Sequence, residues 1–122
     1  MVSGRFTSFQ RGRDAERTAE RFLLRQGLKL IQRNYRGRHG EIDLVMEDSD
    51  TLVFVEVKSR SATQHGEAIE AIDLQKQTRI IHTANQYLAQ QNQNRYCRFD
   101  AIGFNGAVSE QNLQWIKNAF SG

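Results

Sequence analysis

The sequence predicts a mixed α/β fold, in which a β-sheet of about five strands is flanked by helices in the order α-β-β-β-α-β-β. Two segments, residues 12–26 and 74–91, have helical spacing of apolar side chains, and strand-like segments lie between and after them. Two adjacent strand-like segments are joined by turn residues, which is typical of a β-hairpin. The 122 residues are 39% hydrophobic and 25% charged, which is typical of one globular domain spanning 1–122.

The first helix is expected at residues 12–26. Its apolar side chains fall within one arc at 100° per residue, and the arginines lie away from that arc: the apolar set is Ala15, Ala19, Phe22 and Leu23. Gly27 follows as a typical residue just after a helix. We expect residues 1–11 to form a flexible N-terminal segment.

Three strands follow in the prediction. A short strand at 28–34 leads into a basic, glycine-flanked loop at 36–40. The segments 41–47 and 52–58 each alternate in side-chain character, and the turn residues 48–50 join them. We expect Ile42, Leu44 and Met46 to share one face of the sheet.

The second half of the chain predicts a helix between two groups of strands. Residues 67–72 are ambiguous between a short helix and an extended segment. Asp73 is a suitable N-cap for a helix at 74–91. Further strands are expected at 95–104 and 113–117.

The hairpin brings acidic residues together. A two- or four-residue loop centred on Ser49-Asp50 pairs residues whose numbers sum to 99 and puts six side chains on one face: Val45 opposite Phe54, Asp43 opposite Glu56, and Glu41 opposite Lys58. Opposed like charges are destabilising, so the pair of carboxylates calls for a cation. Oxygen ligands suit Mg²⁺ or Mn²⁺. Alternatively, Lys58 bridges Glu41 and Glu56, and Asp43 is partly solvated at a sheet end.

Charge is distributed unevenly along the chain. Residues 1–40 hold ten Lys/Arg and three Asp/Glu, a balance of +7, whereas residues 41–122 hold seven and eleven, a balance of −4. This asymmetry indicates either a surface for a polyanion beside a cation site or a solvated arginine-rich helix face.

A single cysteine and the lack of a long apolar run favour a cytoplasmic protein that does not enter a membrane.

The motifs resemble a known family. Gly40-Glu41-Ile42-Asp43, followed thirteen positions later by Glu56-Val57-Lys58, resembles the PD-(D/E)XK nuclease superfamily with its restriction-endonuclease-like fold. The longer string resembles the YraN-type family of predicted bacterial endonucleases, which are akin to archaeal Holliday junction resolvases. Further matching pieces extend over residues 12–120 and include Glu16, Ala19, Arg33-Asn34, Val53 to Arg60, Lys76, Ala84, Tyr87-Leu88 and Arg98-Phe99-Asp100.

This resemblance implies roles for individual residues. Asp43 and Glu56 would bind the metal together with the backbone carbonyl of Val57, and Lys58 would orient or activate the attacking water. Glu16 would complete the site from the first helix. On a helical wheel Glu16 lies about 20° from Leu23, at the edge of the buried arc, whereas Glu20 lies about 60° away and remains an alternative.

The activity implied is Mg²⁺- or Mn²⁺-dependent hydrolysis of phosphodiester bonds in branched or otherwise structured DNA, by a protein that is a homodimer if it follows the resolvases. Candidates for binding nucleic acid are basic residues near these motifs, namely Arg13, Arg36, Arg38, Arg60 and Lys76. Two alternatives stay open: a catalytically silent nucleic-acid-binding module, and an interaction subunit of a DNA-processing complex.

Overall fold

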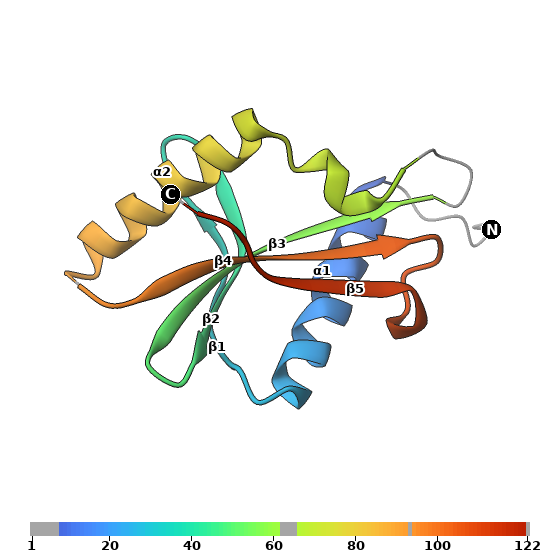
Figure 1. Ribbon diagram of the computed structural model, residues 1–122, viewed down its shortest axis with the longest axis horizontal. Coiled ribbons are helices and arrows are strands. Elements are labelled where there is room, and N and C mark those ends of the chain that lie inside the picture. The colour runs from blue at the N-terminus through green and yellow to red at the C-terminus, as the bar shows by residue number, and fades with distance from the viewer. Residues whose placement is uncertain (1–7, 62–65, 93, 122) are drawn as a thin grey trace.

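The polypeptide folds into a mixed sheet with one long helix against each face (Figure 1). The computed structural model describes residues 8–61, 66–92 and 94–121. Over these residues the sheet has five strands in the spatial order β1-β2-β3-β4-β5. The elements are α1 (Ser8–Arg25), β1 (Lys29–Arg36), β2 (Glu41–Asp48), β3 (Thr51–Arg60), η1 (Ala68–Ala71), α2 (Leu74–Gln90), β4 (Cys97–Asn105), η2 (Glu110–Asn112) and β5 (Leu113–Phe120). The predicted fold class and element order are confirmed.

The helix boundaries differ from the prediction at one end. Helix α1 begins at Ser8 rather than at residue 12, so it includes the last residues of the segment expected to be flexible; residues 1–7 lie outside the described residues. The ambiguous stretch after β3 forms the 3₁₀ helix η1. Asp73 is the N-cap of α2, as predicted, because its Oδ1 accepts a hydrogen bond of 2.8 Å from the backbone N–H of Lys76.

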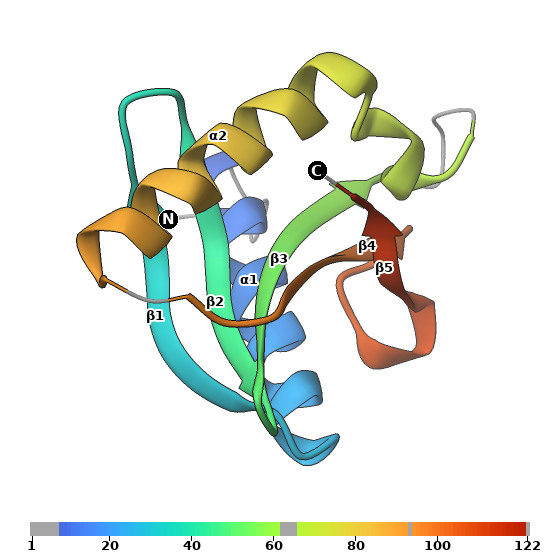
Figure 2. The same ribbon diagram turned by 60° about the vertical axis from the view of Figure 1, so that its left-hand side comes forward.

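Each helix covers its own face of the sheet (Figure 2). The apolar arc of α1 packs on one face with strand residues such as Leu44, Val55 and Phe104. The apolar side of α2 packs on the other face with strand residues such as Val45 and Phe54. Strand side chains alternate between faces, so the central strands contribute to both cores. No helix in the described ranges is both long and apolar enough to cross a membrane.

The β2–β3 hairpin has the predicted register. Pairing runs from Asp48–Thr51 to Leu44–Val55, and the numbers of each pair sum to 99. Beyond Leu44–Val55 the side chain of Asp43 bonds to β3, because its Oδ2 accepts a hydrogen bond of 2.8 Å from the backbone N–H of Val57. The two strands therefore diverge where the carboxylates lie.

The predicted face of Ile42 is wrong. Leu44 packs in the core beneath α1, but Ile42 packs with Tyr35 in the core beneath α2. The change of face lies opposite Asn34, whose φ of 49° is in the left-handed region that asparagine tolerates better than most residues. This irregularity places Asp43 at the boundary between the two layers.

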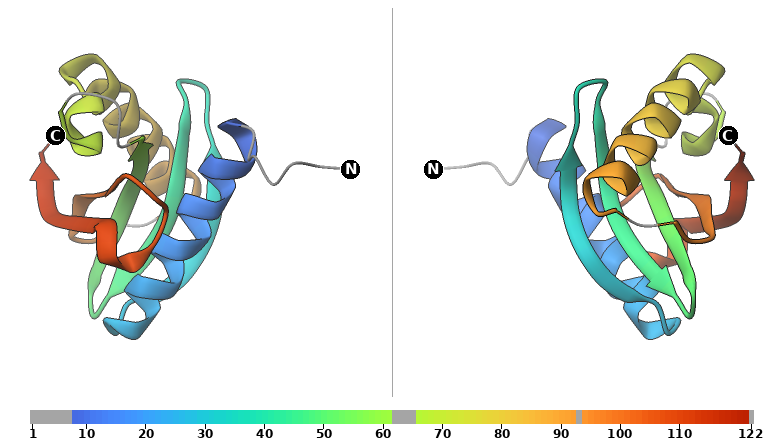
Figure 3. Two further views of the ribbon diagram at one scale, coloured as in Figure 1. Left: turned by 90° about the vertical axis from the view of Figure 1, so that its right-hand side faces the viewer. Right: turned by 90° about the vertical axis from the view of Figure 1, so that its left-hand side faces the viewer.

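Strand β3 lies at the centre of the sheet (Figure 3). It pairs antiparallel with β2 and parallel with β4, the latter from Leu52–Cys97 to Arg60–Asn105. Helix α2 lies in the crossover between β3 and β4, as parallel neighbours require. Glu56 and Lys58 therefore project from the part of β3 that pairs with β4 on one side and has diverged from β2 on the other.

Candidate functional site

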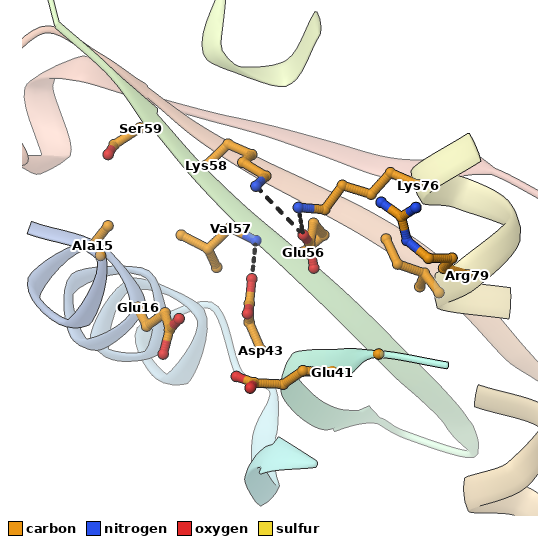
Figure 4. A pocket seen from close by; sticks show the side chains of 13 residues that line it. Ala15, Glu16, Glu41, Asp43, Glu56, Val57, Lys58, Ser59, Lys76 and Arg79 are labelled. Atoms are coloured by element: carbon orange, nitrogen blue, oxygen red, sulfur yellow. Dashed lines mark hydrogen bonds and ion pairs between the residues drawn. The ribbon is translucent and has the colours of Figure 1, made fainter. Parts of the chain in front are cut away.

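A cavity of about 400 Å³ opens where β2 and β3 diverge (Figure 4). Side chains from both helices line it, Glu16 from α1 and Lys76 and Arg79 from α2. The structure places every residue predicted to be catalytic or metal-binding in the lining of this cavity: Glu16, Asp43, Glu56, Val57 and Lys58.

Three carboxylates form a cluster on the α1 side of the cavity. Glu16, Glu41 and Asp43 are half-buried, and each offers an oxygen within 4.8 Å of the others. Asn34 holds two of them, because its Nδ2 donates hydrogen bonds of 2.9 Å to Glu16 Oε1 and to Glu41 Oε2. Neither Glu41 as a ligand nor Asn34 as its hydrogen-bond donor was predicted from the sequence. The alternation that puts Glu41 on the same face as Asp43 was the available signal for Glu41.

Glu56 lies deeper, on the α2 side, and is 5% exposed. Its Oε2 lies 3.0 Å from Lys76 Nζ and 4.0 Å from Lys58 Nζ. Its Oε1 is buried and has no hydrogen-bond partner among the described residues. A buried carboxylate oxygen without a partner is costly, and a hard divalent cation is the ligand that such an oxygen fits. The oxygen donors of this cavity therefore match Mg²⁺ or Mn²⁺.

The electrostatics of the cavity reflect this excess of acid. Burial, together with the charges of Glu56 and Glu16, raises the pKa of Asp43 well above its usual range, although the Val57 N–H opposes the change. Burial and the neighbouring ammonium of Lys76 lower the pKa of Lys58. Burial also disfavours the charge on Lys76, but the ion pair with Glu56 outweighs it and raises the pKa of Lys76.

The structure shows which of the two candidate glutamates of α1 faces the site. Glu16 faces the carboxylate cluster, whereas Glu20 is 8% exposed and accepts two hydrogen bonds from Arg33, at 2.7 and 2.8 Å. Glu20 does not line the cavity that holds Asp43. Glu16, which the helical wheel places at the edge of the buried arc, therefore lies on the side of α1 that faces the site.

The basic residues predicted to bind nucleic acid differ in what they contact. Arg36 donates to Glu41 at 3.3 Å, and Arg13 lies over the ring of Phe9 at 5.6 Å; both line one hollow beside α1. Lys76 pairs with Glu56, and Arg60 ends β3 with its carbonyl accepting from the Gly106 N–H. Arg38 lies in a neighbouring hollow beside α2.

Comparison with known proteins places these residues in a family context. The model of a family described as "Uncharacterised protein family UPF0102" matches residues 15–104. A UPF0102 protein of Nitrosomonas europaea is 48% identical over 110 residues, which cover 90% of this chain and 92% of the relative. A UPF0102 protein of Colwellia psychrerythraea is 43% identical over 117 residues, covering 93% and 91%.

Proposed function

The chain belongs to the uncharacterised protein family UPF0102, and we propose that it is a metal-dependent nuclease that hydrolyses phosphodiester bonds in branched or otherwise structured DNA. This is the YraN-type family that the sequence motifs resemble. The observation that carries the proposal is the buried, unpartnered Oε1 of Glu56, in a cavity that also holds Asp43 and Lys58.

The residues present fit a divalent ion. Glu16, Glu41 and Asp43 form the carboxylate cluster that would hold Mg²⁺ or Mn²⁺. Glu56 and the carbonyl of Val57 belong to the same cavity and would be the further ligands. When bound, such an ion polarises a phosphoryl oxygen and lowers the pKa of a bound water.

The side chains around the ligands supply the remaining chemistry. Lys58 is placed to orient the attacking water and to stabilise negative charge that grows on the phosphoryl oxygens, because its Nζ lies 4.0 Å from Glu56 at the edge of the cavity. Lys76 fixes the Oε2 of Glu56, which leaves Oε1 as the oxygen directed to a ligand. Asn34 sets the spacing of Glu16 and Glu41 before any ion binds.

A cleavage assay tests the proposal. Purified wild type, Asp43→Asn and Lys58→Ala are incubated with a panel of branched and linear DNAs in Mg²⁺, Mn²⁺ or EDTA. Asp50→Asn, which makes the same chemical change in the exposed β2–β3 turn, is the matched control. We expect cleavage by wild type and Asp50→Asn that requires the metal, and a loss of about 100-fold or more in the other two variants.

The alternative outcomes identify other functions. If wild type binds DNA but no protein in the set cuts it, the chain is a silent nucleic-acid-binding module. If it neither binds nor cuts, the chain is better described as an interaction subunit. Equal cleavage by wild type and Asp43→Asn would show that the activity does not arise from this cavity.

A further inference from the structure

A cationic surface lies beside the cavity, on α2 and the loop between β1 and β2. Arg79 lines the cavity, and His82, one turn further along α2, lines a neighbouring hollow of about 460 Å³. Three more side chains from the loop and from α2 line that hollow and complete its polar surface: Arg38, His39 and Gln86, with Asn85 at the rim. We call Arg38, His39, Arg79, His82 and Gln86 the α2–loop surface.

The loop is fixed on the helix rather than simply lying near it. The backbone N–H of Arg38 donates to Gln86 Oε1 at 2.9 Å, and the N–H of Gly37 donates to the Gly40 carbonyl at 2.8 Å. A Cβ at position 37 would lie 2.6 Å from Gln86 Oε1 and 3.1 Å from the Cγ2 of Thr83, so a larger residue would displace the Gln86 amide that accepts from Arg38. The loop side chains are thereby presented beside those of α2.

The two imidazoles contact each other across this junction. The rings of His39 and His82 have centroids 5.3 Å apart at 66°, an edge-to-face contact. One ring therefore directs its edge at the face of the other. Both residues are exposed, so their ring nitrogens can donate to or accept from a ligand in solvent.

Carboxylates are distributed unevenly around this surface. In the described ranges, the guanidinium groups of Arg38 and Arg79 form no ion pair, and no carboxylate lines the hollow that holds Arg38. Arg79 lines the acidic cavity itself. The hollows toward α1 differ, because Arg33 pairs with Glu20, Arg36 pairs with Glu41, and Glu16 lines both of them. A polyanion that leaves the cavity toward α1 therefore meets carboxylates among the arginines, whereas the hollow toward α2 has none among the described residues.

We propose that the α2–loop surface binds the phosphodiester backbone of a nucleic-acid strand as it leaves the cavity, and that the strand follows α2 rather than α1. This inference rests on the proposed function, because the cavity is taken as the place where the strand is cut. The eight residues from Arg79 to Gln86 extend about 10 Å along the helix, which is enough for more than one phosphate. Contacts of this kind position a strand without reading its sequence.

The experiment compares two variants that lose the same charge. Arg38→Gln/Arg79→Gln removes two cations from the α2–loop surface, and Arg17→Gln/Arg21→Gln removes two exposed cations from α1. Binding of a fluorescently labelled branched DNA is measured by anisotropy in EDTA, where no cleavage occurs, at several salt concentrations. Circular dichroism checks that each variant is folded.

We expect the first double variant to bind at least tenfold more weakly and to lower the slope of log affinity against log salt by about 1 to 2, the change for one or two lost phosphate contacts. The control should stay within about twofold of wild type. Arg38→Lys/Arg79→Lys keeps both charges and should keep most of the affinity, and His82→Ala should weaken binding without changing the slope.

The inference is overturned if both Gln double variants lose affinity equally, if neither loses it, or if wild type binds no DNA. It fails separately from the proposed function. If the α2–loop variant loses binding while wild type never cuts in Mg²⁺, the binding role of the α2–loop surface is supported and the nuclease proposal is refuted. If wild type cuts while the α2–loop variant binds normally, only the binding role of the α2–loop surface is refuted.

Discussion

Replacing Lys76 with methionine tests whether Glu56 lies in a cation site. Lys76 Nζ lies 3.0 Å from Glu56 Oε2, and the carboxylate is almost fully buried. Removing one partner of a buried ion pair costs about 3–5 kcal/mol. The side chain of Lys76 is 26% exposed and Lys58 remains at 4.0 Å, so we expect Lys76→Met to lower the free energy of unfolding by about 2 kcal/mol without divalent ions.

Urea denaturation in EDTA and in Mg²⁺ measures this effect. With a slope of about 2 kcal/mol per molar urea, the midpoint of the variant should fall by about 1 M in EDTA. Mg²⁺ should restore much of that loss, because an ion bound by Glu56 replaces the missing ammonium and stabilises only the folded state. Lys29→Met, on the exposed strand β1, is the matched control and should respond to neither change.

The reasoning about Lys76 is refuted by either of two results. In the first, Lys76→Met is as stable as wild type in EDTA, which would show that Glu56 does not need a cation. In the second, the variant is destabilised equally with and without Mg²⁺, which would show that the lost contact is packing rather than charge.

Three further predictions concern the carboxylates. The pKa of Asp43 is raised in the folded, metal-free protein, so its protonated form favours folding at acid pH and that contribution is lost as the pH rises through the folded pKa. In EDTA, the stability of wild type should therefore fall above about pH 4, and Asp43→Asn should reduce this fall. Thermal melts at a series of pH values measure the difference. Asn34→Gly keeps a left-handed backbone but removes the amide that joins Glu16 to its neighbour, so calorimetry should show Mg²⁺ affinity reduced about tenfold with little change in melting temperature. Glu16→Gln should abolish metal-dependent cleavage without lowering the melting temperature, whereas Glu20→Gln should lower the melting temperature and leave cleavage intact; the reverse pattern would place Glu20 in the site.

The residues whose positions could be predicted from the sequence lie mainly on regular strands and helices. A two-residue turn at Ser49-Asp50 fixes the hairpin register, and a period of two then fixes the face of every residue in regular pairing. Helical periodicity likewise selects the side of α1 that carries Glu16. These local rules, together with the family resemblance, predicted that Asp43, Glu56 and Glu16 belong to one site, and all three line one cavity.

The contacts that could not be predicted from the sequence depend on irregular backbone or on packing between elements far apart in the chain. The left-handed Asn34 lies opposite the point where β2 changes face, and its amide bonds to Glu16 and Glu41; no periodic pattern reports a single residue of this kind. Lys76 reaches Glu56 only because the crossover between β3 and β4 lays α2 across the end of the sheet. That placement is set by the tertiary structure and not by the residues around Lys76.

The parallel pairing of β3 with β4 also constrains how the protein can be assembled during synthesis. All of the proposed metal ligands precede Lys58 in the chain, so they are synthesised early. The strand that pairs with the second edge of β3 begins only at Cys97 and is synthesised much later. Until then the central strand of the sheet offers an unpaired edge to other nascent chains. A polypeptide stopped at Gln90 would contain the whole candidate metal site and still lack a completed sheet, so the chemistry is inseparable from a C-terminal segment that contributes no ligand to it.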